Sequence, residues 1–472
     1  MKRILLLTLL ALPLLAADPK ASLPFTIEID AALNIKGAPP LQGFASAHAN
    51  GKWLFISGRM TGLHTFKRPT TAKPLNNFPV ADLNDRAWVI DPATRQVWSA
   101  QIPEQFRPWL TMTNGQSDHT GDTLVITGGY GLWPNAPQTT PPRDNMRTLD
   151  TLTIVQVSRA IDAVVNGKDL TPFITQVHDA RVRVTGGELR RIGNTYFLVF
   201  GQVFDGLYSP NNADLGTLFT QTYTEQIASF QLSPAGAISN YAVIQVPARS
   251  GNIPAADARP FHRRDLNVSP VILDDGTPGF AAWGGVFVPG QINAFRKPIY
   301  VQGDGSAYSV DEYQQFMSQY NCAVVPLYSE ATKTMHTTFF GGISLYYLFA
   351  QTQELKRDDG LPFIRNITTL SRSGGKSSEC IASEDLPGLY GSGAQFLPAG
   401  NIATTSNGVL RLDTIKERTL IGYIYGGIYS TQAQSNGRPD LVTSASNTAF
   451  PVYVSPKASP CAAFADASTK TD

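Results

Sequence analysis

The chain has 472 residues, of which 42% are hydrophobic, so it can bury a large core. Its formal net charge is +1 and only 16% of its residues are charged. This balance excludes the strongly basic surface with which proteins bind nucleic acid or anionic membranes through charge alone. We therefore expect local chemistry to select any partner.

The first residues have the pattern of a secretory signal. Lys2 and Arg3 precede an apolar run over residues 4–15, and the small residues Ala16 and Ala17 follow it. The run is shorter than the ~20 residues that a membrane-spanning helix needs. We predict a signal peptide over residues 1–17, export to the periplasm or the extracellular space, and no membrane insertion after cleavage.

Six extended apolar segments end on glycine. TLVITGG at 123–129 is typical, and the first glycines of the six stand at positions 58, 128, 201, 284, 341 and 426. Most of these segments follow a tight turn rich in Gly, Asn or Asp, which predicts β-hairpins. Further strands, such as AWVIDPATRQVW at 87–98, complete units of four strands. An irregular repeat of this length indicates the blades of a β-propeller.

The glycine doublets resemble the kelch repeat, in which Gly-Gly follows an apolar strand and a Tyr-Asp-Pro-like strand ends in Trp. The doublet is reduced to one glycine at Gly58 and Gly201 and is intact in the other segments, while VIDPATRQVW at 89–98 matches the second half of the repeat. The resemblance implies an all-β protein of the secreted bacterial kelch type, related in fold to galactose oxidase. It implies one six-bladed propeller with four-stranded blades over residues 25–455.

The ends of the repeat predict how the propeller closes. FTIEI at 25–29 has no hairpin partner, whereas the last repeat ends in FPVYVS at 450–455. We predict that the N-terminal strand completes the last blade, because this arrangement leaves neither edge strand exposed. Residues 456–472 are small and polar, which predicts a flexible tail. Short helices are predicted only over 158–167 and 309–320, each opened by a serine cap.

Three cysteines allow at most one intramolecular disulfide. Among the possible pairs we favour Cys380 with Cys461, because that bond would tether the C-terminal tail. Cys322 lies in an apolar strand, where a free thiol packs as a small hydrophobic group.

Asparagine recurs just ahead of predicted first strands, which converge on the channel mouth in this fold. With Gln42 and Glu188 these asparagines could form a polar ring, or they could instead bond to turn backbone. Arginines lie upstream of several of them and could pair with a carboxylate or sulfate, or remain solvated at the surface. The candidate ligand-binding residues are Arg107, Asn114, Arg181, Arg183, Arg264, Asn267, Asn321 and Asn407.

Glu188, His178 and Asp265 are the candidate catalytic residues. Glu188 and Asp265 lie near predicted strand starts and could be the paired acids of a hydrolase, whereas Glu188 or His178 could transfer a proton in an epimerase. The histidines have no close metal-ligand spacing. A copper site like that of galactose oxidase would need a Tyr-His pair, and the sequence has no such dipeptide. We therefore expect no metal and no other cofactor.

These patterns predict an exported monomer that binds a carbohydrate or a protein ligand at the loop-covered channel mouth, with no nucleic acid partner. Two alternatives stay open. Six-bladed kelch propellers of exported bacterial proteins include sialic acid mutarotases, so the resemblance also allows an epimerase or mutarotase acting on an acidic sugar. The chain could otherwise be a structural component of a surface or an assembly.

Overall fold

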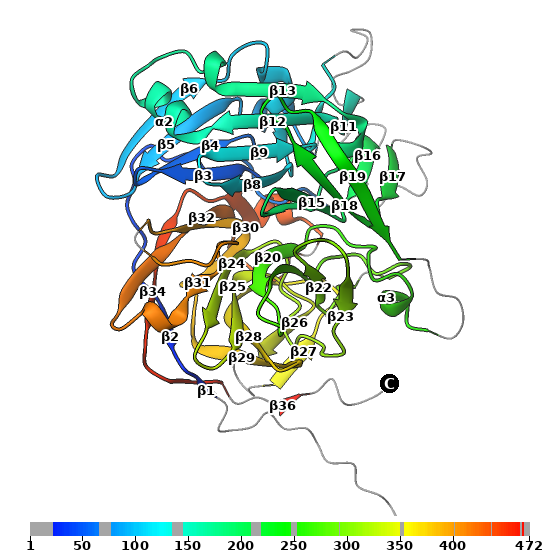
Figure 1. The fold of residues 1–472 in the computed structure, drawn as a ribbon, viewed down its shortest axis with the longest axis vertical. Coiled ribbons are helices and arrows are strands. Elements are labelled where there is room, and N and C mark those ends of the chain that lie inside the picture. The colour runs from blue at the N-terminus through cyan, green and yellow to red at the C-terminus, as the bar shows by residue number, and fades with distance from the viewer. Residues whose placement is uncertain are drawn as a thin grey trace, which may run out of the picture.

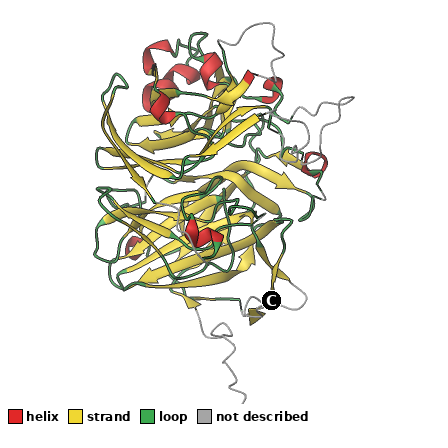
Figure 2. Ribbon diagram, turned by 90° about the vertical axis from the view of Figure 1, so that its right-hand side faces the viewer, coloured by secondary structure: helices red, strands yellow, loops and turns green. Residues whose placement is uncertain are grey.

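The computed structural model describes residues 22–65, 77–134, 145–208, 219–246, 253–291, 293–349, 354–400, 402–435, 437–462 and 465–466. The predicted signal peptide over 1–17 lies outside these residues. Strands dominate the described part, and the few short helices lie outside the sheets (Figure 2), which confirms the all-β class. No helix in this part of the chain is long and apolar enough to cross a membrane.

The first four predicted repeats each form a four-stranded antiparallel sheet with its strands in chain order. The first three of these sheets lie in the upper half of the molecule as drawn in Figure 1, and the fourth lies in the lower half. Their strands are β3 (Ala45–Ala49), β4 (Lys52–Ile56), β5 (Arg86–Asp91) and β6 (Gln96–Gln101); β8 (Gln116–Thr120), β9 (Thr123–Thr127), β12 (Thr151–Gln156) and β13 (Ile174–His178); β14 (Glu188–Ile192), β15 (Thr195–Val199), β18 (Gln226–Leu232) and β19 (Ile238–Gln245); and β20 (Asn267–Ile272), β21 (Pro278–Trp283), β22 (Ile299–Gln302) and β23 (Tyr308–Val310).

The last two repeats form larger sheets. The fifth has the order β29-β28-β25-β24-β31, and in the sixth β30, β32, β34 and β2 lie side by side while β33 pairs with β32. The strands of the fifth are β24 (Ala323–Ser329), β25 (Thr334–Ile343), β28 (Phe363–Ser373), β29 (Lys376–Asp385) and β31 (Leu410–Arg411), and those of the sixth are β2 (Thr26–Ile29), β30 (Leu389–Pro398), β32 (Thr419–Ser430), β33 (Thr443–Ala445) and β34 (Ala449–Ser455).

The innermost strands of the six sheets contact one another in a cycle. β3 lies against β8, β8 against β14, β14 against β20, β20 against β24, β24 against β30, and β30 returns to β3. A backbone hydrogen bond also joins the sixth sheet to the segment before the first, from Gly427 N to Leu41 O at 2.8 Å. This arrangement is compatible with the predicted propeller.

The predicted pairing of the N-terminal strand is confirmed. β2 is antiparallel to β34, with Thr26 opposite Ser455 and Ile29 opposite Val452. Beside this pair, β1 (Ser22–Leu23) pairs with β35 (Ser459–Pro460).

The predicted disulfide is also present. Cys380 and Cys461 are joined, with their Cα atoms 5.2 Å apart, and Cys322 is free and buried. Burial raises the pKa of the Cys322 thiol to about 12, so this thiol is protonated at neutral pH and packs as a small apolar group.

One of the two predicted helices is present. α2 (Val157–Val165) packs its apolar face on the first and second sheets, although Ser158 donates to Asp122 instead of capping the helix. The helix predicted over 309–320 is wrong. β23 ends at Val310, and residues 311–320 contain no helix. Residues 317–320 are all buried, so this end of the segment has no exposed face of the kind that a surface helix requires.

Short helical turns occupy several connections between strands. They are α1 (Arg107–Leu110), α3 (Ala255–Ala258), α4 (Pro439–Val442), η1 (Val80–Asp82), η3 (Thr171–Phe173), η4 (Ala180–Val182) and η5 (Leu412–Thr414).

The loops that follow the glycine stops form additional small sheets. One joins loops of the second and third repeats and includes a short strand that leads into the second sheet, and the other pairs a loop of the fifth repeat with the C-terminal segment. Their strands are β7 (Met112–Thr113), β10 (Tyr130–Leu132), β11 (Met146–Thr148), β16 (Gln202–Gly206) and β17 (Phe219–Tyr223), and β26 (Tyr346–Phe349), β27 (Glu354–Arg357) and β36 (Ala465–Asp466).

Close packing between repeats explains the glycine stops. A Cβ on Gly128 would lie 2.0 Å from Val184 O, in the segment that leads into the third sheet. A Cβ on Gly341 would lie 2.3 Å from Tyr390 O of the sixth sheet. Both glycines also have positive φ, so two independent constraints select glycine where one repeat meets the next.

Candidate functional site

All six sheets, or the segments that lead into them, contribute to one small polar cavity, which we call the axial cavity. Its volume is about 50 Å³, room for a few water molecules. Its polar side chains are Asn114, Ser117, Glu188, Arg190, Asp265, Asn321 and Gln395.

A ring of residues with left-handed backbone surrounds the axial cavity, one from each repeat. Backbone hydrogen bonds connect several neighbours in this axial ring, including Asn114 N to Gly43 O at 3.0 Å and Asp265 N to Gly186 O at 2.7 Å. Gly, Asn and Asp are the residues that tolerate this conformation best. The ring consists of Gly43 (φ 58°), Asn114 (φ 53°), Gly186 (φ 67°), Asp265 (φ 50°), Asn321 (φ 48°) and Gly393 (φ 69°).

The ring explains the recurring asparagines. Asn114 and Asn321 stand at equivalent positions of the ring, where each adopts a positive φ. The sequence left open whether these asparagines serve the turn backbone or a ligand, and this conformation is a role in the turn backbone. Both side chains also line the axial cavity, so the two roles coexist.

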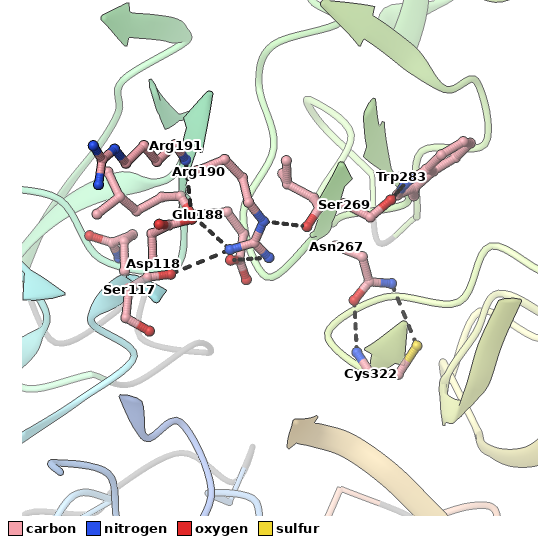
Figure 3. A network of polar contacts seen from close by, with 12 residues as sticks. Ser117, Asp118, Glu188, Arg190, Arg191, Asn267, Ser269, Trp283 and Cys322 are labelled. Atoms are coloured by element: carbon pink, nitrogen blue, oxygen red, sulfur yellow. Dashed lines mark hydrogen bonds and ion pairs between the residues drawn. The ribbon is translucent and has the colours of Figure 1, made fainter. Parts of the chain in front are cut away.

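Glu188 is the carboxylic acid of the third sheet in the axial cavity. Its Oε2 lies 3.2 Å from Arg190 Nη2, and 25% of its side chain is exposed. Burial raises the Glu188 pKa to about 7; Asp118 raises it further, while Arg190 opposes the shift. Figure 3 shows these three side chains together on β14 and β8. Glu188 is therefore present in both protonation states near neutral pH.

Arg190 is held by backbone carbonyls. Its Nε donates to Val268 O at 2.8 Å, and its Nη1 donates to Leu189 O at 2.6 Å and to Ser117 O at 3.3 Å. With Glu188 beside it, this guanidinium is largely committed to the protein itself. Among the described residues that line it, the axial cavity thus has no free cation to offer a negatively charged ligand.

Asp265 gives the axial cavity a second carboxyl group. It lies 3.6 Å from the Nε of Arg264, and burial raises its pKa. Arg264 itself is buried and is not among the residues that line the cavity; its Nη2 donates to the Tyr208 hydroxyl at 3.0 Å.

The basic sector expected from the arginines does not assemble. Arg107 lies on α1, Arg181 pairs with Asp179 at 2.6 Å, and Arg183 pairs with Asp205 while donating to Thr148 O at 3.0 Å. None of them lines the axial cavity, and Arg264 reaches it only through Asp265. Arg183 meets Asp205 on a distant segment, which sequence spacing does not reveal. Arg181 and Arg264 instead lie beside carboxylates one or two positions away in the chain.

Two predicted asparagines also lie elsewhere. Asn267 is buried and bonds to backbone. It accepts from Cys322 N at 2.8 Å (Figure 3) and donates to Gln319 O at 3.2 Å. Asn407 donates to Val271 O at 2.9 Å and Gly279 O at 3.1 Å. It was expected before the first strand of the sixth repeat, but that strand is β30, and the strand after Asn407 is β31, at the edge of the fifth sheet.

His178 lies on β13, the outer strand of the second sheet. Its Nδ1 is 2.9 Å from Asp150 Oδ1, and its ring meets the edge of Trp109 with centroids 4.4 Å apart. It is not among the residues that line the axial cavity, so it does not face Glu188 or Asp265.

Sequence reasoning missed several cavity residues. Ser117, Arg190 and Gln395 lie inside strands, and β30 itself was not predicted. The glycines of GSGAQF at 391–396, just ahead of Gln395, are the signal that could have indicated a sixth turn at the axis.

No protein family model matches the chain, and no curated protein matches it. Within the described ranges, no three His, Cys, Asp or Glu side chains gather in a way that could hold a metal ion.

Proposed function

We propose that the six sheets are the blades of a closed, kelch-type β-propeller, that the chain is exported, and that it binds a carbohydrate at the axial cavity. The cyclic contacts of the innermost strands support closure, as does the addition of β2 to the last sheet. The disulfide supports export, because such bonds persist mainly in oxidising compartments.

One observation carries the binding proposal: segments of six different sheets line one cavity, and five of them direct polar side chains into it. Asn114, Asn321 and Gln395 offer amides, and Ser117 offers a hydroxyl. Glu188 accepts hydrogen bonds when it is ionised and can donate one when it is protonated. This mixture of donors and acceptors suits the hydroxyl groups of a sugar. Because the cavity is small, the ligand would insert one edge and lie under the loops.

The charge of the axial cavity favours a neutral sugar over an acidic one. Glu188 and Asp265 both carry carboxyl groups, and the guanidinium of Arg190 is already bonded to carbonyls. A carboxylate ligand would meet like charge without a free cation to compensate it.

A proton-transfer enzyme, such as an epimerase or mutarotase, is the second candidate, and the Glu188 pKa of about 7 favours it. A general acid or base works best when its pKa lies near the working pH. Asp265 is the only other predicted proton-transfer residue that lines the same cavity.

The test is calorimetric titration of the mature chain with galactose, glucose, mannose and N-acetylglucosamine. We expect saturable binding of at least one sugar and a loss of ~10-fold or more in affinity for Gln395→Leu, which leaves a sugar hydroxyl unpaired. Gln245→Leu is the matched control, because Gln245 is exposed on an outer strand. Equal losses in both variants, or no binding, would contradict the proposal.

Glu188→Gln separates the two candidates. A binding module should keep its affinity within a few-fold, because glutamine preserves the size and one acceptor of the side chain. A proton-transfer enzyme should lose ~10²-fold or more in turnover, measured by NMR as ligand interconversion or deuterium exchange.

A further inference from the structure

A second cavity of about 280 Å³ lies away from the axial cavity, between the loops of the fourth and fifth repeats. Its walls come from α3, from the loop after Gly284-Gly285, and from β26 and β27. We call it the cationic pocket, because Arg263, Arg296, Lys297 and Arg357 line it while Asp257 is its one lining carboxylate among the described residues.

Two of the four cations are already neutralised. Lys297 Nζ lies 3.2 Å from Asp257 and 3.3 Å from Glu312. Arg357 Nε lies 2.9 Å from Asp359. The excess charge of the pocket therefore comes from the two remaining arginines.

Arg263 is a buried cation without a carboxylate partner among the described residues. Its guanidinium donates to the carbonyl oxygens of Pro260, Gly284 and Lys297 at 2.7, 3.0 and 2.9 Å. It also lies over the ring of Phe295, 4.4 Å from the centroid. These contacts fix the charge in the wall but do not cancel it, because carbonyl dipoles carry no net charge.

Arg296 is held in place with donors to spare. Its Nε donates to Gln315 O at 2.8 Å, its Nη1 donates to Gln314 Oε1 at 3.1 Å, and its guanidinium lies 4.5 Å from the centroid of the Tyr346 ring. Within the described part of the chain, Nη2 has no hydrogen-bond partner and no carboxylate lies within ion-pair distance. A fixed guanidinium with free donors is the preferred partner of a carboxylate or sulfate.

We propose that the cationic pocket binds a small organic anion with one acidic group and several hydroxyl groups. The acidic group pairs with Arg296 Nη2, in the field of the buried Arg263. The side-chain amides of Gln291, Asn293 and Gln314 line the same cavity and suit the hydroxyl groups. The volume, near the lower end of known ligand pockets, fits a molecule of monosaccharide size.

The experiment is calorimetric titration of the mature chain with sodium D-glucuronate, D-glucose and sodium sulfate at one ionic strength. We expect glucuronate to bind and Arg296→Gln to lower its affinity by ~10-fold or more, the loss typical of one charged hydrogen-bonded pair. Arg181→Gln is the matched control, since Arg181 is an exposed arginine outside both cavities. Gln395→Leu should leave glucuronate binding intact, so this proposal can fail independently of the axial one.

Glucuronate affinity that is equal in the wild type and Arg296→Gln would overturn the proposal, as would the absence of saturable binding by glucuronate. Binding of sulfate without binding of glucuronate would overturn the proposal that the ligand carries hydroxyl groups. If thermal unfolding reveals a damaged fold in Arg296→Gln, Asn293→Leu takes its place. The expected result is then a several-fold loss for glucuronate without a loss for sulfate, and equal glucuronate affinity in Asn293→Leu and the wild type would overturn the proposal.

Discussion

The axial cavity and the cationic pocket each contain a half-buried arginine, yet they offer opposite chemistry. Arg190 donates to three carbonyls and lies beside Glu188, so its donors are already bonded and the neighbouring carboxyl group offsets its charge. Arg296 donates to a carbonyl and an amide and retains free donors among the described residues. The comparison teaches that the acceptors around an arginine, rather than its burial, decide whether it can bind an anion.

Removing the disulfide should cause the largest loss of stability, and it should weaken binding at the cationic pocket. Ala462, next to Cys461, packs on the apolar cluster that contains Tyr346 and Leu355. Releasing a loop of 81 residues in Cys461→Ser should lower the free energy of unfolding by about 4 kcal/mol. Denaturant unfolding measures this loss, and titration of the folded variant should show weaker glucuronate binding with unchanged binding at the axial cavity.

The double variant Cys380→Ser/Cys461→Ser provides the control. It should be no less stable than either single variant, because both substitutions remove the same bond. A further loss of unfolding free energy in the double variant, or weaker binding at the axial cavity, would contradict the prediction that the Cys380–Cys461 disulfide supports the cationic pocket alone.

Gly43→Ala should have the next largest effect and should damage the axial cavity. Gly43 has a φ of 58°, and a Cβ there would lie 2.3 Å from Asn114 Oδ1 and 2.5 Å from Thr113 Oγ1. Strain and overpacking together should cost about 3 kcal/mol of unfolding free energy. In Gly51→Ala, where φ is 73° and nothing lies within 4 Å of the added Cβ, only about 1 kcal/mol should be lost. Equal losses in the two variants would argue against a packed axial ring.

The smallest effect is a pH dependence that belongs to the axial cavity alone. The Glu188 pKa is about 7 in the folded chain and 4.5 for an ordinary glutamate. The contribution of Glu188 to stability is therefore fully present below pH 4.5 and is lost as the pH rises through 7. Glu188→Gln should remove about 2 kcal/mol of that loss, less than the ~3 kcal/mol to which the full pKa difference corresponds, because 25% of the Glu188 side chain is exposed.

Denaturant unfolding at pH 4.5 and pH 8 measures this difference. Glu330→Gln, a substitution of an exposed carboxylate, is the control and should keep the wild-type pH dependence. Glucuronate binding at the cationic pocket should respond to Glu188→Gln at neither pH.

The repeats were predictable because their signals are local. A hairpin turn and a glycine stop lie within one short segment, so the sequence indicates each of them without knowledge of distant partners. The sixth repeat was only half predicted. β30 pairs with β32 across an intervening stretch of residues 399–418, and SNG at 406–408 in that stretch imitates the start of a strand pair.

The candidate site was less predictable because its chemistry depends on non-local partners. Asn114, Asn321, Glu188 and Asp265 were found, since each lies at or beside a turn that sequence patterns indicate. None of the predicted arginines lines this cavity. The partner of Arg183 was not predictable, because Asp205 meets it through the pairing of β11 with β16, whereas Asp179 lies only two positions from Arg181. The cationic pocket was missed entirely, since its walls come from two repeats whose loops show no shared motif.

The pairing of β2 with β34 has a consequence for biosynthesis. The Ser455 hydroxyl donates to Glu28 at 2.7 Å across a separation of 427 residues. At ~5–20 residues per second, the ribosome releases the first strand roughly 20 to 90 s before its neighbour exists. Throughout that interval the last sheet cannot be completed. Under the proposed export, a translocation machinery that engages the nascent chain would meet a polypeptide whose last sheet is still incomplete.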